Sequence, residues 1–327
     1  MLLRLARRTL LLALVFIAPL ALLTAFAPYL APSIKRLDHV AAAQATQGSF
    51  DKGLLWRVEK PGAAPSHLFG TVHLADKRVT ALLEVVRKQL DAAQSFTMEI
   101  ALDPPNIAAL AARMVYTDGR DLPGVAGEEL FRKVVPLMAG YGMPPELLRL
   151  FKPWAVTLML AMPQQQRQQQ RQRKRQQPED VLDFTLHRIA SEQGKPLHYL
   201  ETVDDQVAAF EGMSETDQVA LLKHAVEIQH ELPATTDKLL EAYLQGDLGL
   251  IWQINEASVK DQPELKPLNE VFAQRLLFDR NVRMFERMQP QLRAGNAFVA
   301  VGALHLYGEK GILSLLARAG WQVTRIY

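Results

Sequence analysis

The sequence predicts an α/β fold, with a central sheet built from two strand–Gly-x-x-His–helix–strand units at the chain ends and a large helical insertion between them. One observation is the internal match between residues 68–74 (LFGTVHL) and 300–306 (AVGALHL). Another is that short apolar or alternating runs, typical of strands, occur near both ends of the chain. The third is that residues 107–278 have apolar residues almost entirely at helical spacing.

The first unit opens a domain expected over residues 51–327. Residues 53–59 and 67–72 predict two strands that form a hairpin around a turn rich in proline and glycine. The spacing of apolar residues predicts a helix over 79–93, and a strand is expected over 95–100.

The helical section that follows is interrupted by glycines and prolines. Its exception is a short strand expected at 196–202, after a helix over 181–191. Residues 163–178 are rich in glutamine and arginine and have no apolar face to bury, so we expect a low-complexity, solvated loop there. The helix breaks are expected at Gly119, residues 123–127, residues 140–145 and Pro153.

The second unit ends the chain. It consists of a strand at 297–302, a helix at 311–319 and a strand at 321–327. Because the two units share one pattern, we expect them to pair within one sheet.

Composition excludes several classes of protein. The chain has 327 residues, of which 49% are hydrophobic and 22% charged, so it is neither wholly disordered, collagen-like nor a multi-span membrane protein. The absence of cysteine excludes disulfides, thiolate metal sites and cysteine nucleophiles. Two segments, 1–36 and 163–178, are basic, whereas the rest of the chain has a mildly negative net charge. We therefore expect no nucleic acid among the partners.

Residues 1–36 are predicted to be a membrane anchor or signal segment, followed by a linker over 37–50. Residues 9–34 carry no charge and exceed the roughly 20 residues that cross a bilayer. Three arginines precede them, which places the N-terminus in the cytoplasm. We therefore expect a single-pass protein of the cytoplasmic (inner) membrane with a periplasmic or extracellular C-terminal domain; a cleaved, secreted form is the alternative.

The two Gly-x-x-His motifs are the strongest functional signal. Glycine permits a tight exit from each strand, and His73 and His305 then follow at the carboxyl ends, the edge where open α/β sheets bind ligands. Glu99 and Glu201 end two further strands at that edge. The alternative is that each histidine is a hydrogen-bonded structural residue, since a single such tetrapeptide occurs by chance in many chains.

Two neutral imidazoles with a carboxylate form a site suited to Mn, Co, Fe or Zn. An ion there polarises a carbonyl group and lowers the pKa of water. One glutamate would then be a ligand and the other a general base.

Several separate segments, in order, resemble the TraB/GumN family, which includes membrane-tethered metalloproteases of the Tiki type. The resemblance covers most of residues 51–327 and is most specific near the C-terminus. The segments are both Gly-x-x-His motifs, residues 98–100 (MEI), 152–154 (KPW), 200–202 (LET) with Gln206, Tyr243 with 246–247 (GD), 276–281 (LLFDRN), 298–308 (FVAVGALHLYG), 311–316 (GILSLL) and 320–323 (GWQV).

The resemblance implies a divalent-metal-dependent hydrolase, and the expected activity is that of a peptidase acting on peptides or proteins outside the cytoplasmic membrane. His73, His305 and Glu99 would be the metal site, with Mn or Co as the ion. Arg280 and Asn281 match a polar pair of the family and would orient the site or stabilise an oxyanion; without the resemblance they read as helix surface or as a buried network with Glu201. The alternative function is a non-catalytic, membrane-anchored regulator that binds a peptide or a haem-like ligand. Nothing in the sequence sets the oligomeric state.

Overall fold

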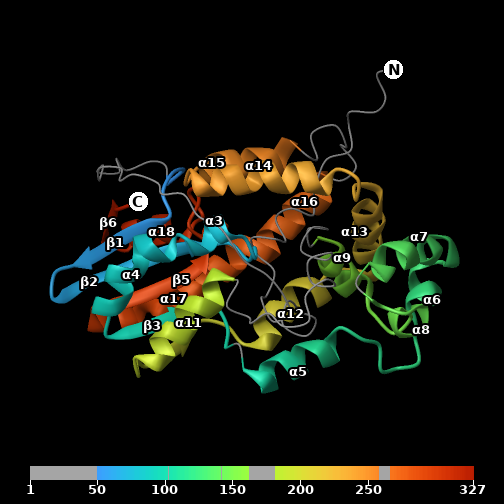
Figure 1. Cartoon of the computed structure of the whole chain (residues 1–327), viewed down its shortest axis with the longest axis horizontal. Coiled ribbons are helices and arrows are strands. Elements are labelled where there is room, and N and C mark those ends of the chain that lie inside the picture. The colour runs from blue at the N-terminus through green and yellow to red at the C-terminus, as the bar shows by residue number, and fades with distance from the viewer. Residues whose placement is uncertain (1–49, 102, 141, 162–180, 258–265) are drawn as a thin grey trace.

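The computed structural model of the protein describes residues 50–101, 103–140, 142–161, 181–257 and 266–327. Its six strands form one sheet in the order β4-β3-β5-β2-β1-β6, in which every strand but β1 runs parallel to the others (Figure 1). The strands are β1 (Leu55–Lys60), β2 (Ala63–Thr71), β3 (Ser95–Met98), β4 (Leu197–Tyr199), β5 (Ala297–Gly302) and β6 (Gln322–Arg325).

Helices on the sheet come from the regions near both ends of the chain and, in α11, from its middle. They are α3 (Lys77–Thr80), α4 (Leu83–Ala92), α11 (Leu182–Glu192), α17 (Asp279–Ala294) and α18 (Ile312–Arg318). Helix α4 packs with α11, whereas α18 packs with α17. The chain crosses from β2 to β3 in one direction along the sheet and from β5 to β6 in the other. Because such crossovers are right-handed, the two pairs of helices cover opposite faces.

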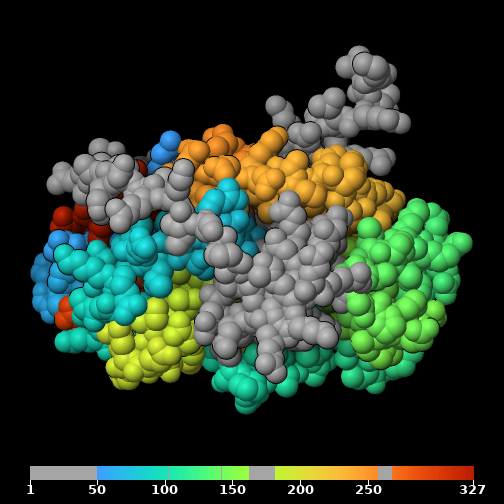
Figure 2. All heavy atoms as spheres, in the orientation of Figure 1, coloured from blue at the N-terminus to red at the C-terminus, as the bar shows by residue number. Residues whose placement is uncertain are grey.

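The remaining helices form a second part of the molecule beside the sheet. Figure 2 shows the blue and red chain ends together at one side and the green helices α6 to α8 at the other. These helices are α5 (Pro104–Arg113), α6 (Leu122–Ala126), α7 (Glu128–Ala139), α8 (Pro145–Leu148), α9 (Pro153–Ala161), α12 (Val203–Glu211), α13 (Glu215–Glu227), α14 (Leu232–Leu244), α15 (Leu248–Ala257) and α16 (Lys266–Ala273). A π-helix, η2 (Gln274–Phe278), joins α16 to α17, and a 3₁₀ turn, η3 (Ala303–His305), follows β5.

The sheet is held by apolar side chains on neighbouring strands. The Phe96 and Phe298 rings stack with centroids 6.2 Å apart, and Phe69 lies 6.5 Å from Phe298. All six residues of β5 are buried. A strand covered by helices on both faces needs a continuous apolar sequence, and this explains the unbroken run in the second motif.

The predicted α/β fold is confirmed, including the parallel pairing of the two units. Two local predictions are wrong. Residues 79–93 form two helices, because at the junction the backbone N–H groups of Leu82, Glu84 and Val85 bond to carbonyls three residues before them. The expected break at 123–127 lies almost wholly within helix α6, because Asp121 caps its N-terminus and Pro123 occupies its first turn, where no backbone N–H is needed.

The predicted single-pass location in the inner membrane is corrected. Within the five described ranges, no helix is long and apolar enough to cross a bilayer. Helix α9 is apolar on all sides but has nine residues, whereas a span needs about 20. The segment 9–34 on which the prediction depended lies outside the described residues, as do the predicted loop 163–178 and most of the linker. The division of the chain at residues 36 and 50 stays a prediction.

Candidate functional site

The two Gly-x-x-His motifs lie side by side at one edge of the sheet. Strands β2 and β5 pair so that Thr71 faces Gly302, which places His73 and His305 just beyond the same edge. Gly70 has no room for a side chain, because an added Cβ would lie 3.0 Å from the Ala303 Cα of the second motif. The glycine therefore allows the backbones of the two motifs to pack closely.

His305 is held by an amide from helix α17. The Asn281 Nδ2 donates to the Lys310 carbonyl at 2.9 Å, and this orients the amide so that its Oδ1 faces His305 Nδ1 at 2.6 Å. An amide oxygen only accepts, so His305 Nδ1 must carry the proton. The other ring nitrogen, Nε2, then has a lone pair, and it lies 3.8 Å from Glu99 Oε1.

Glu99 follows β3 and reaches across to β5. Its Oε1 accepts a hydrogen bond from the Gly302 backbone N–H at 2.6 Å, and its Oε2 accepts from Arg280 at 2.8 Å. Burial raises the pKa of Glu99 above its ordinary value, against the opposing charges of Arg280 and His73. The carboxylate is thus placed beside His305 by the backbone of the second motif.

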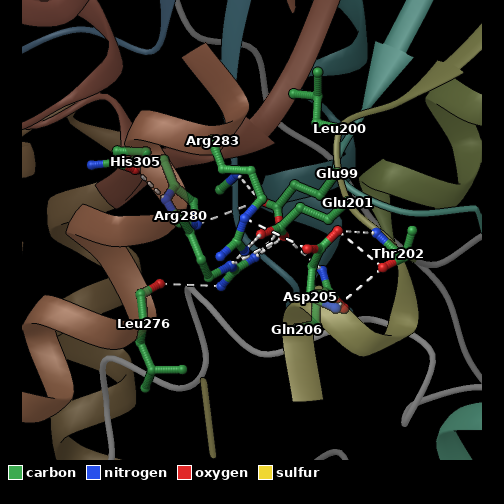
Figure 3. A network of polar contacts seen from close by, with 12 residues as sticks. Glu99, Leu200, Glu201, Thr202, Asp205, Gln206, Leu276, Arg280, Arg283 and His305 are labelled. Carbon is green, nitrogen blue, oxygen red and sulfur yellow. Dashed lines mark hydrogen bonds and ion pairs between the residues drawn. The ribbon is translucent and has the colours of Figure 1, made fainter. Parts of the chain in front are cut away.

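Arg280 lies between two buried carboxylates. Its Nε and Nη2 donate to Glu201, which follows β4, while Nη2 also donates to Glu99 and Nη1 to the Leu276 carbonyl of the π-helix (Figure 3). The arginine is 2% exposed and Glu201 is 4% exposed, so this network is inside the protein. The π-helix places an extra residue in the turn before Arg280, and such turns are frequent at functional sites.

Polar residues surround Glu201, from the buried Gln206 to the partly exposed Arg283, Asp205 and Arg287. Gln206 donates to Glu201 at 3.2 Å, and Arg283 lies 3.5 Å from it (Figure 3). Asp205, in the first turn of α12, accepts from Thr202 and Arg287. The Glu201 network therefore extends towards the surface on this side.

His73 has a different partner, which the sequence did not predict. The Asp183 carboxylate, in the first turn of α11, lies 3.3 Å from His73 Nδ1, and its other oxygen accepts from the Thr71 hydroxyl at 2.6 Å. Asp183 is 4% exposed. A carboxylate inside the otherwise apolar run from Val181 to Phe184 is the one signal in the sequence that marks it.

The two histidines have opposite electrostatics. Burial lowers the pKa of His73, but the Asp183 and Glu99 carboxylates together outweigh burial, and the net pKa is raised. Burial, together with the positive charges of Arg280 and His73, holds the pKa of His305 well below its ordinary value. At neutral pH, His305 is therefore a neutral base, and His73 is the ring that retains a proton more readily.

The predicted metal set is brought to one edge of the sheet but is not closed into a metal-binding group. Across the residues that the structure describes, no three His, Cys, Asp or Glu side chains are placed to hold an ion. The donor chemistry still fits one. The Nε2 atoms of His73 and His305 are buried without a hydrogen-bond partner in the described part of the chain. His305 Nε2 and Glu99 Oε1 are both hydrogen-bond acceptors and face each other. A cation or a proton between these two atoms would stabilise the arrangement.

Comparison with known proteins gives one family. The profile of the TraB/PrgY/gumN family matches residues 54–325, so it includes every site residue described above. Comparison with solved structures gives no significant match.

Among curated proteins, the chain is similar to Metalloprotease TIKI1 of Danio rerio, with 24% identity over 316 residues that cover 82% of this chain and 62% of the relative. Metalloprotease TIKI2 of Danio rerio is 26% identical over 318 residues, covering 82% and 60%. The protein YbaP of Escherichia coli (strain K12) is 24% identical over 261 residues, covering 78% and 89%. The chain thus spans about three fifths of the length of the metalloproteases.

Proposed function

Because the chain belongs to the TraB/PrgY/gumN family, we propose that it is a divalent-metal-dependent hydrolase that cleaves peptides or proteins. The observation that carries this proposal is the meeting of His73, His305 and Glu99 at the ends of three neighbouring strands, with both histidine Nε2 atoms lacking a hydrogen-bond partner among the described residues. The peptide part of the proposal is supported by the names of relatives that are about 24% identical and longer than this chain.

His73 and His305 would hold the ion, and Glu99 would be either its third ligand or the general base. Two imidazoles and a carboxylate suit Mn or Co, and also Zn or Fe. Such an ion acts as a Lewis acid that polarises a carbonyl group and lowers the pKa of water. The lone pair on His305 Nε2 is already fixed by Asn281, so this nitrogen needs no loss of a proton to bind a cation.

The surrounding residues would set the position and charge of Glu99. Its raised pKa suits a general base, since a base works best when its pKa is near the operating pH. Arg280 restrains Glu99 from one side and is itself held by Glu201. In this arrangement Arg280, Glu201 and Asn281 position other groups, and Glu99 is the residue that would act on the substrate.

Metal content tests the site. The purified protein should contain or take up about one equivalent of Mn²⁺ or Co²⁺, and His73→Ala and His305→Ala should each lose it. His230→Ala is the matched control, because its side chain is 72% exposed and lies outside the site. Metal retained at the wild-type level in both site variants would overturn the metal centre.

Turnover of a peptide library tests the reaction. We expect cleavage that a chelator stops and that Glu99→Gln reduces by a factor of at least about 10², the contribution typical of a general base. Peptide retention without cleavage, unaffected by the chelator, would instead favour the ligand-binding alternative.

A further inference from the structure

We propose that Asp183, held by Thr71, is a positioning residue that fixes the proton of His73 on Nδ1, so that His73 faces the shared site through its unprotonated Nε2. This inference rests on the proposed function, because it concerns how His73 would face a cation. Asp183 lies in helix α11, more than a hundred residues along the chain from the motif it contacts.

The contacts of Asp183 leave one oxygen for His73. Asp183 Oδ1 accepts from the Thr71 hydroxyl at 2.6 Å, and Asp183 Oδ2 lies 3.3 Å from His73 Nδ1. Oδ2 and both nitrogens of His73 are buried and make no hydrogen bond in the described ranges, so the Nδ1–Oδ2 contact is a close approach rather than a formed hydrogen bond. A carboxylate oxygen only accepts, so the stable arrangement is an N–H on Nδ1 pointing at it.

Thr71 links this contact to the sheet. It is the last residue of β2, two positions before His73, and its Cα is paired with that of Gly302 on β5. Its side chain is fully buried, so the hydroxyl has little choice of acceptor. Helix α11 is thereby fixed against the strand that ends in the first motif.

In the second motif, the side chain of Asn281 fixes the histidine proton in the same way. Asn281 accepts from His305 Nδ1 and leaves Nε2 with a lone pair, as Asp183 does for His73. Both histidines therefore turn the same nitrogen to the site. A carboxylate behind an imidazole also makes it a better ligand, and loss of such a partner typically weakens metal affinity by 10–100-fold.

The test reads the His73 tautomer directly, without relying on activity. Long-range ¹H–¹⁵N spectra of the metal-free protein, recorded above the His73 pKa and assigned with His73→Gln, distinguish Nδ1–H from Nε2–H. We expect Nδ1–H in the wild type, a mixture in Asp183→Leu, and Nε2–H in Asp183→Asn, because its single amide oxygen accepts from Thr71 and its NH2 group then faces His73 Nδ1. Mn²⁺ affinity, measured by competition with a chelator, should fall by about 10–100-fold in both Asp183→Leu and Asp183→Asn.

Two further variants keep the test decisive. Asp237→Leu, at an exposed position of α14, should change neither readout. Thr71→Val removes only the hydroxyl that holds Asp183 and should give an intermediate loss, which serves if Asp183→Leu fails to fold. A wild-type proton on Nε2, or an unchanged tautomer in both Asp183→Leu and Thr71→Val, would overturn the inference. If the tautomers are as expected but the protein binds no metal, the proposed function is refuted and the role of Asp183 in fixing the His73 proton is still supported.

Discussion

His73 and His305 end neighbouring parallel strands through the same Gly-x-x-His sequence, yet their surroundings differ. His73 is backed by a carboxylate from α11, whereas His305 is backed by an amide from α17. The pKa of the first is raised by its partner, and that of the second is held low by burial and nearby cations. The repeated motif therefore sets where the two rings lie, and helices from elsewhere in the chain set their charge.

We call each histidine with the residues that contact it the His73 half and the His305 half of the site. The two halves also differ in how far they depend on ion pairs. The His305 half includes Glu99, which shares Arg280 with Glu201. The His73 half has Asp183, which makes no salt bridge to a lysine or an arginine of the described residues. Substitutions should therefore affect the His305 half more strongly through stability, and the His73 half more through ligand binding.

The largest effect is expected from Arg280→Met. The substitution leaves the carboxylates of Glu99 and Glu201 buried without their cation, which costs about 3–5 kcal/mol when a buried pair is broken. Urea unfolding measures the loss in the free energy of unfolding.

Arg287→Met is the matched control on the same helix. Its side chain is 42% exposed and pairs with Asp205, so the loss should be at most about 1 kcal/mol. Equal losses for the two arginines would mean that the buried network adds no special stability to the His305 half.

The positions of the two histidines and of the two glutamates could be predicted from the sequence. The matched motifs predicted that β2 and β5 pair and that His73, His305, Glu99 and Glu201 meet at one edge, because carboxyl ends of parallel strands share an edge. A contact between Arg280 and Glu201 was also among the expectations, as the alternative to the oxyanion role.

The contact between Asp183 and His73 could not be predicted in the same way. An acid in the first turn of a helix is common, since it interacts favourably with the helix dipole, so the position of Asp183 alone does not predict a role at the site. Only the packing of α11 against β3 and α4 reveals that this turn points inward, at Thr71 and His73. The distance between an acid on one helix and a strand end far along the chain is a tertiary property that no local pattern encodes.

An intermediate effect is expected from Asn281→Leu. The change removes the acceptor of His305 Nδ1–H and the donor to the Lys310 carbonyl, and leaving a buried polar group unpaired costs about 1–3 kcal/mol. Long-range ¹H–¹⁵N spectra should show His305 losing its preference for Nδ1–H while His73 keeps its own.

Val282→Ala, at the next and 46% exposed position, is the control and should leave both rings unchanged. A simultaneous change at His73 in Asn281→Leu would mean that the two halves are coupled and that the contrast between their partners is not local.

The smallest effect concerns the outer layer of the His305 half. Partial burial raises the pKa of Asp205, but hydrogen bonds from Arg287 and Thr202 outweigh it and lower the pKa to about 2, from 3.8. A depressed pKa contributes stability above the unfolded value, and this contribution is lost as the pH falls through the folded value. The stability difference between the wild type and Asp205→Asn should therefore be constant above about pH 5 and shrink towards pH 2. Urea unfolding over this pH range measures the difference. A difference that does not change with pH would show that Asp205 acts as a helix cap rather than through its charge. The His305 half would then have no electrostatic link to the surface through this residue.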